Sequence, residues 1–133
     1  MGLFIAERIR QREFGREISP ADRSTLLGAA EICLATPIAG RGLPAGTRLL
    51  KAYATTAQGP RRILYLLLVR EGDLFVLFHR TKQDEVGENL SSRNPAFQRA
   101  LTRHLELLRE DLAAGRIEEI RPDTGDPTRL RRA

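Results

Sequence analysis

Apolar residues recur at helical spacing in the N-terminal part of the chain. Residues 3–14 place them among Glu and Arg in a helical rather than an alternating pattern, which predicts a first helix. A second helix is expected to begin at Ser19 and Pro20, because serine caps helices and proline fits their first turn. It should end before Pro37, since helical backbone is disfavoured at a residue that precedes proline. The chain is therefore expected to begin with two helices.

A longer helical pattern lies nearer the other end of the chain. Asn94 and Pro95 repeat the combination of a capping residue and a first-turn proline, and Gly115 is placed to end the helix. The apolar positions between them form a single stripe. About 20 helical residues would span roughly 30 Å, which is enough to cross a small sheet completely.

Between these helical segments the pattern changes to that of strands. Residues 47–54 form one candidate strand, and residues 62–69 hold an almost unbroken apolar run, as in a strand covered on both faces. A turn over residues 70–73 leads into a return strand over 74–80, and residues 117–120 are expected to add a short edge strand. The predicted fold class is α+β: a small antiparallel sheet that packs one face against two N-terminal helices and one long C-terminal helix.

Length and composition predict one domain over residues 1–120, followed by a flexible basic tail over 121–133. The chain has 133 residues, of which 41% are apolar and 29% charged, as in globular proteins with a core. Its single cysteine, Cys33, allows neither a disulfide framework nor a cysteine-based metal site, and no metal or cofactor is expected. The apolar run over residues 3–6 is too short for a signal peptide or a membrane span. We therefore expect a cytoplasmic protein that makes no membrane contact.

The net charge of +5 is concentrated in one stretch of the chain. Residues 48–82 contain seven cations and two anions, whereas cations and anions balance over the rest. Such clustering is typical of a surface that binds the phosphates of a nucleic acid. The alternative is that arginines at strand edges and turns discourage the association of sheets. The seven cations are Arg48, Lys51, Arg61, Arg62, Arg70, Arg80 and Lys82.

Three segments of this stretch carry a likeness to a known family. The segment 46–51, at the first predicted strand, ends in a lysine. In the segment 61–65 an arginine pair opens an Ile-Leu-Tyr run. The third segment, 74–78, runs into His79-Arg80-Thr81-Lys82. With the order of predicted elements, this pattern resembles the RelE/ParE superfamily of type II toxins. The chain departs from the family where it reads Gln-Gly-Pro over 58–60, since the family has a glycine pair before the central arginine.

The resemblance implies a function as well as a fold. It implies a RelE-like toxin, acting as a metal-independent endoribonuclease that cleaves messenger RNA at the ribosome and is neutralised by a small antitoxin protein. A ParE-like or degenerate member that inhibits its target by binding, without cleaving RNA, is the second possibility. A non-catalytic module that binds RNA or the ribosome, and inhibits by binding, is the third. The missing glycine pair favours the last two.

Cleavage of RNA without a metal needs a proton acceptor, a proton donor and cations that offset charge on the phosphate. His79 is the first candidate for proton transfer, because cations nearby would favour its neutral form. The alternative is that His79 is merely a half-buried residue at a strand end. In that case the resemblance implies that Lys51 carries the proton. The expected catalytic set is His79, Lys51, Arg62, Arg80 and Lys82, and the expected RNA-binding set is Arg48, Arg61, Arg62, Arg80 and Lys82.

Several of these residues have simpler interpretations. Arg80 and Lys82 would face the same side only if the strand continues to residue 82. One arginine of the pair at 61–62 could cap the loop at Pro60 instead of binding phosphate. His104 is expected to be a core or boundary residue of the third helix. The acidic residues of 84–88 are expected to form a solvated loop rather than a metal site.

Overall fold

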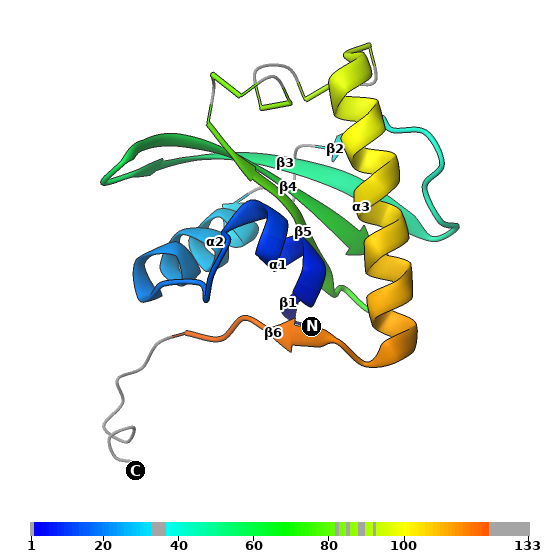
Figure 1. Cartoon of the computed structure of the whole chain (residues 1–133), viewed down its shortest axis with the longest axis horizontal. Helices are drawn as coiled ribbons and strands as arrows, with labels where there is room; N and C mark the ends of the chain where they lie inside the picture. Colours follow the sequence, from blue (N-terminus) through cyan, green and yellow to red (C-terminus); the bar gives the residue numbers. More distant parts are fainter. Residues whose placement is uncertain are drawn as a thin grey trace.

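The computed structural model describes residues 2–32, 37–81, 83–84, 86–87, 90–91 and 93–122, the side chain of residue 32 excepted. Its strands form one sheet, and its helices lie around that sheet (Figure 1). The elements are β1 (Leu3–Ala6), α1 (Glu7–Glu13), α2 (Pro20–Ile32), β2 (Pro37–Ile38), β3 (Thr47–Thr56), β4 (Gly59–Leu68), β5 (Leu74–Arg80), α3 (Pro95–Ala114) and β6 (Ile117–Glu119). The expected tail lies outside the described residues from residue 123 onward.

The sheet has six strands in the order β2-β3-β4-β5-β1-β6. All neighbouring strands are antiparallel except β1 and β5, which run parallel. The central hairpin pairs β3 with β4 along its whole length, from Thr47 opposite Leu68 to Thr56 opposite Gly59. This arrangement confirms the α+β class, the mostly antiparallel sheet and the three predicted core strands.

The start of the chain corrects the sequence-based prediction. Residues 3–6 form a strand rather than the first turn of a helix, and only residues 7–13 are helical. The strand inserts between β5 and β6, where the side chain of Ile5 is fully buried. A short, wholly buried apolar run does not distinguish a strand from a helix by its periodicity. The pairing with a strand 70 residues away decides the outcome.

The prediction that the helices pack on one face of the sheet is wrong, because α2 and α3 cover opposite faces. Successive residues of a strand point to opposite faces, and Leu64 and Tyr65 of β4 are both fully buried. The Tyr65 hydroxyl donates to the carbonyl oxygen of Leu26 in α2 at 2.6 Å. Phe78, which pairs with Leu64, packs against Phe97 of α3 with ring centroids 5.9 Å apart. The sheet therefore has an α2 face and an α3 face, because its central strands are apolar on both sides.

The ends of the helices agree with their sequence signals. Ser19 accepts a hydrogen bond from the amide of Asp22 at the start of α2, and Asn94 accepts one from the amide of Ala96 at the start of α3. Gly115 ends α3 in the left-handed conformation, with φ of 73°. The long helix is followed by β6, so it is not the last element, and β6 confirms the expected edge strand.

A buried carboxylate ties the beginning of α1 to the end of α3. Asp111 accepts hydrogen bonds from the backbone amide of Arg8 at 3.0 Å and from its guanidinium at 2.9 Å. The guanidinium of Arg116 also donates to Asp111 at 2.9 Å. Because α1 has only seven residues, contacts with other elements rather than its own hydrogen bonds must hold it in place.

The two tyrosines of the chain provide a test of the α2 face. Tyr65→Phe should lower the free energy of unfolding by about 1–2 kcal/mol, since it removes a buried hydrogen bond. Tyr53→Phe, at an exposed position, should leave stability unchanged. Urea denaturation of the two variants measures the difference. Equal stability of the two variants would contradict the packing of α2 on Tyr65.

Candidate functional site

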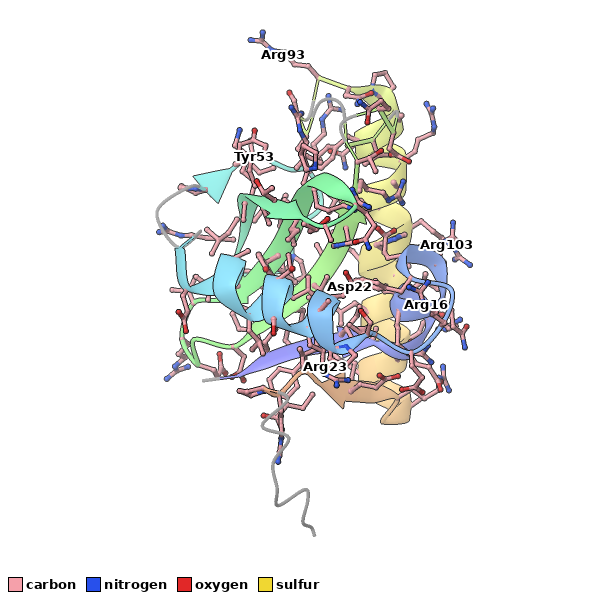
Figure 2. All side chains as sticks on the ribbon, turned by 90° about the vertical axis from the view of Figure 1, so that its left-hand side faces the viewer. Arg16, Asp22, Arg23, Tyr53, Arg93 and Arg103 are labelled. Atoms are coloured by element: carbon pink, nitrogen blue, oxygen red, sulfur yellow. The ribbon has the colours of Figure 1, made fainter. Side chains whose placement is uncertain are left out.

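Three residues of the predicted basic region come together on the α3 face of the sheet. Tyr53 of β3 pairs with Arg62 of β4, and Lys51 lies two residues before Tyr53 on the same face. The guanidinium carbon of Arg62 lies 5.2 Å from the centroid of the Tyr53 ring, and Lys51 Nζ lies 5.6 Å from it. Tyr53 is 61% exposed and stands near the top of the molecule in Figure 2. We refer to Lys51, Tyr53 and Arg62 as the Tyr53 cluster.

The loop after β5 holds Arg62 in this position. Its guanidinium donates to the carbonyl oxygen of Gly87 at 2.9 Å. Gly87 is buried, and a Cβ atom there would collide with the carbonyl oxygen of Thr81 and the side chain of Arg80. Only glycine therefore lets this loop approach β5 closely enough to support Arg62.

Arg80 pairs with Arg62 in the sheet, but carboxylates already occupy its guanidinium. Arg80 donates to Glu13 at 2.7 and 2.8 Å and to Asp84 at 3.0 Å, while its guanidinium lies over the ring of Phe78. These two carboxylates compensate its positive charge. Arg80 therefore lies beside the Tyr53 cluster as a structural cation rather than as an open phosphate ligand.

Glu13 is the centre of a buried network that sequence analysis did not identify. Besides Arg80, it accepts hydrogen bonds from the backbone amide of His79 at 2.8 Å and from Nε2 of His104 at 2.9 Å. Burial alone would raise the pKa of Glu13, but the hydrogen bonds from His104 and Arg80 and the charge of Arg80 outweigh it and lower that pKa. His104 is fully buried, which confirms the expectation that it belongs to the core.

His79 lies on the other face of the sheet from the Tyr53 cluster. It pairs with Ile63, and its ring stacks on Phe14 with centroids 4.7 Å apart. Burial lowers the pKa of His79, and the charge of Arg61 adds to this although that of Asp22 opposes it. Burial, rather than the neighbouring cations alone, is thus the leading cause of the lowered pKa. The structure does not bring it together with Arg80, because successive strand residues point to opposite faces.

Two of the other predicted cations, Arg48 and Arg61, lie on the opposite face of the sheet from the Tyr53 cluster. Arg48 is exposed and pairs with Leu67, which places it on the α2 face. Arg61 also belongs to the α2 face, and its guanidinium donates to the carbonyl oxygen of Pro60 at 3.0 Å, as in the loop-capping interpretation. β5 ends at Arg80, and Lys82 lies outside the described residues.

Asp84, in the acidic loop after β5, forms hydrogen bonds with other groups of the same chain. Asp84 accepts hydrogen bonds from Arg80 and from the backbone amides of Val86 and Gly87, whereas Glu85 and Glu88 lie outside the described residues. Across the described ranges, no group of three or more His, Cys, Asp or Glu side chains could hold a metal ion. None of the helices described here is long and apolar enough to cross a membrane.

An apolar groove lies between α3 and the sheet, away from the Tyr53 cluster. Its volume is about 560 Å³ and it is open to solvent. Its charged lining residues are Arg41, Arg109 and Glu106, and Glu106 is paired with Arg103 at 3.4 Å. The large apolar side chains that line it are Leu66, Leu68, Phe75, Leu105, Leu108 and Leu112.

No protein-family model, curated protein or solved structure matches this chain. Evidence about its function therefore comes from the arrangement of its own side chains. The Tyr53 cluster combines two cations with an exposed aromatic ring.

The buried network predicts a pH dependence of stability. Because the folded pKa of Glu13 is lowered, its contribution is complete above the unfolded-state pKa and is lost as the pH falls through the folded pKa. Glu13→Gln should lower the free energy of unfolding at pH 7 by about 2–4 kcal/mol, since it leaves Arg80 partly unpaired. It should also make the loss of stability below about pH 5 shallower. Glu31→Gln, at an exposed position of α2, is the control. If the free energy of unfolding fell equally steeply with decreasing pH in Glu13→Gln and in wild type, this account would be contradicted.

Proposed function

We propose that this protein is a RelE-like toxin of a type II toxin–antitoxin system that acts on messenger RNA at the ribosome. The observation that carries the proposal is the Tyr53 cluster, in which two cations and an exposed ring occupy adjacent positions on one sheet face. Phosphate contacts position an RNA strand, and aromatic rings stack on its bases. Lys51 and Arg62 come from segments on which the family resemblance rests, whereas Tyr53 lies two residues beyond the first of them.

Cleavage on this surface would follow the metal-independent route. The 2′-oxygen attacks the adjacent phosphorus, the bond to the 5′-oxygen of the next nucleotide breaks, and a 2′,3′-cyclic phosphate remains. The proton of the 2′-hydroxyl must leave, and the departing 5′-oxygen must gain one. We assign to the Lys51 amine the acceptance of the 2′-hydroxyl proton and its delivery to the departing 5′-oxygen, and to Arg62 the offset of charge on the phosphate.

Inhibition by binding alone is the second candidate, as in a ParE-like or a non-catalytic member. It is favoured by the placement of His79 on the α2 face and by the two carboxylates that compensate Arg80. On this account the Tyr53 cluster holds RNA or the ribosome but transfers no proton. The two functions share the same surface and differ in what Lys51 does.

Substitutions in and around the Tyr53 cluster separate these functions. Lys51→Ala should reduce cleavage of ribosome-bound messenger RNA by a hundredfold or more with little change in binding, because proton transfer contributes to rate rather than affinity. Arg62→Ala should weaken binding in a salt-dependent way. His79→Ala should retain cleavage, since its ring faces away from the cluster.

Cleavage and binding are to be measured in parallel, with thermal unfolding as a control for folding. Loss of cleavage in His79→Ala, with Lys51→Ala fully active, would contradict the assignment of roles. RNA that stays intact during prolonged incubation with ribosome-bound wild type would remove the endonuclease and leave the binding function.

The proposed antitoxin partner has a candidate docking surface in the apolar groove beside α3. The short helix α1 offers no apolar side chain for docking, because Ile9, its one apolar residue, is fully buried. The groove offers apolar side chains together with two arginines, Arg41 and Arg109, and the carboxylate that lines it, Glu106, is already paired with Arg103. These features fit an amphipathic antitoxin segment that carries carboxylates beside its apolar face.

Leu112 tests this docking surface, since it lines the groove and is 49% exposed. Leu112→Glu should weaken the complex with the small protein encoded by the adjacent reading frame by tenfold or more, and growth arrest should persist on co-expression. Ala113→Glu places the same charge one residue further along α3 at an exposed position outside the groove, and it should bind like wild type. Equal binding by both variants would reject the groove, and harmless expression of the wild type alone would reject the toxin.

A further inference from the structure

The apolar groove beside α3 is a recess with a buried floor. Leu66 of β4 pairs with Phe75 of β5, and these side chains are 2% and 5% exposed. Leu108, which lines the groove from α3, is 4% exposed, whereas Leu112 near the end of the same helix is 49% exposed. The volume of about 560 Å³ lies within the range of about 300–1,000 Å³ that is usual for small-molecule sites. The groove therefore has the size and the lining of a ligand site.

The length of the groove fits an extended chain. On the α3 side, its apolar stripe runs from Leu105 to Leu112, which are about two helical turns or roughly 10 Å apart. On the sheet side, Leu66 and Leu68 are alternate residues of β4 and point to the same face. An extended octanoate or decanoate chain has about this length.

The loop on the third side of the groove is held in place by the chain itself. Gln98 of α3 bonds both backbone groups of Arg41: its side-chain oxygen accepts from the amide, and its side-chain nitrogen donates to the carbonyl oxygen, each at 3.3 Å. The hydroxyl of Thr47 donates to the carbonyl oxygen of Pro44 at 2.6 Å. At Gly40 a Cβ atom would collide with leucine side chains of β3 and α3. Because this wall is already formed, a ligand loses little affinity in ordering it.

The charges of the groove favour an anionic group on the ligand. Arg41 and Arg109 line it, together with one carboxylate, Glu106. Glu106 is paired with Arg103 at 3.4 Å, and Glu110, the acidic neighbour of Arg109 on α3, is paired with an arginine of α1 at 2.7 Å. The two carboxylates on this stretch of α3 thus have other arginines as partners. The lining carries a net positive charge, which attracts an anion.

We propose that the groove binds one molecule of a medium-chain alkyl carboxylate, with the chain on Leu66, Phe75 and Leu108 and the carboxylate at Arg41 and Arg109. Burial of the chain removes apolar surface from water, and a guanidinium donates charge-assisted hydrogen bonds to a carboxylate. The inference goes beyond the proposed function, because it needs neither RNA nor an antitoxin. A bound carboxylate would weaken the proposed antitoxin complex, since both occupy the same groove.

The test is calorimetric titration of the full chain with straight-chain carboxylates from hexanoate to dodecanoate, each below the concentration at which it forms micelles. We expect saturable binding of one molecule per chain. The affinity should rise about fourfold for each added CH₂ group until the groove is filled. The alcohol of the same chain length should bind more weakly, because it lacks the negative charge.

Two pairs of variants locate the chain and the carboxylate. The double variant Arg41→Gln with Arg109→Gln should weaken binding of the carboxylate by about tenfold or more and leave binding of the alcohol unchanged. Its control replaces two exposed arginines outside the groove, Arg93 and Arg99, with Gln and should change neither.

Ala45→Phe adds a ring to the lining without removing a core side chain, so it should abolish binding of both ligands. Ala113→Phe, at an exposed position of α3 outside the groove, should bind both like wild type. Thermal unfolding of each variant is the control for folding.

The other outcomes overturn the inference. Equal affinity of wild type for the carboxylate and the alcohol would remove the anionic part of the site. Binding that does not saturate, or that a folded Ala45→Phe variant retains, would indicate detergent-like association with the surface. If no carboxylate binds, the inference is wrong, and a wild-type dimer that Leu112→Glu dissociates in sedimentation equilibrium would assign the groove to a second copy of the chain. Cleavage and binding of RNA are measured separately, so none of these outcomes decides the proposed function.

Discussion

The buried carboxylate of Glu13 is the interaction on which the arrangement of this protein depends. It lies at the end of α1 and accepts hydrogen bonds from β5 and α3, so three elements meet at one charge. Asp111 holds the other end of α1 in a similar way. Because a buried carboxylate is stable only with its donors in place, these bonds fix α1 along β5 beyond the point where β1 ends. The same bonds compensate the charge of Arg80, whereas Arg62, its neighbour across the sheet, donates to the carbonyl oxygen of Gly87.

Local signals in the sequence predicted the elements that depend on local contacts. The β3–β4–β5 strands follow from their apolar runs and turns, and α3 begins and ends where its capping residues indicate. The strand β1 was missed because four apolar residues read equally as helix or strand, and its pairing with β5 is distant in sequence. The placement of α2 and α3 on opposite faces was missed as well, although the apolar run of β4 already indicated burial on both sides.

The sequence named Lys51 and Arg62 as candidate site residues, but it did not predict on which face of the sheet each candidate lies. Charge clustering pointed to β3, β4 and β5, yet alternation along each strand divides the cations between two faces, which separates His79 from Arg80. Glu13, one of the two carboxylates that bind Arg80, lies 67 residues before it in the sequence, and no sequence pattern links the two residues. Tyr53 was not predicted as a site residue, because the clustering of charge singles out cations and not aromatic rings. Its spacing of two residues from Lys51 and its place in a hairpin opposite an arginine were available as a signal.

The central claim is that RNA binds to the α3 face of the sheet at the Tyr53 cluster. The most direct measurement is a titration of isotopically labelled protein with single-stranded 2′-O-methyl RNA, followed by amide chemical shifts in NMR spectra. The account predicts that the largest changes fall on residues 51–53 and 62 and on the loop at Gly87, and that α2 and the surroundings of Phe14 and His79 change little. Changes centred on α2 and His79 would contradict it.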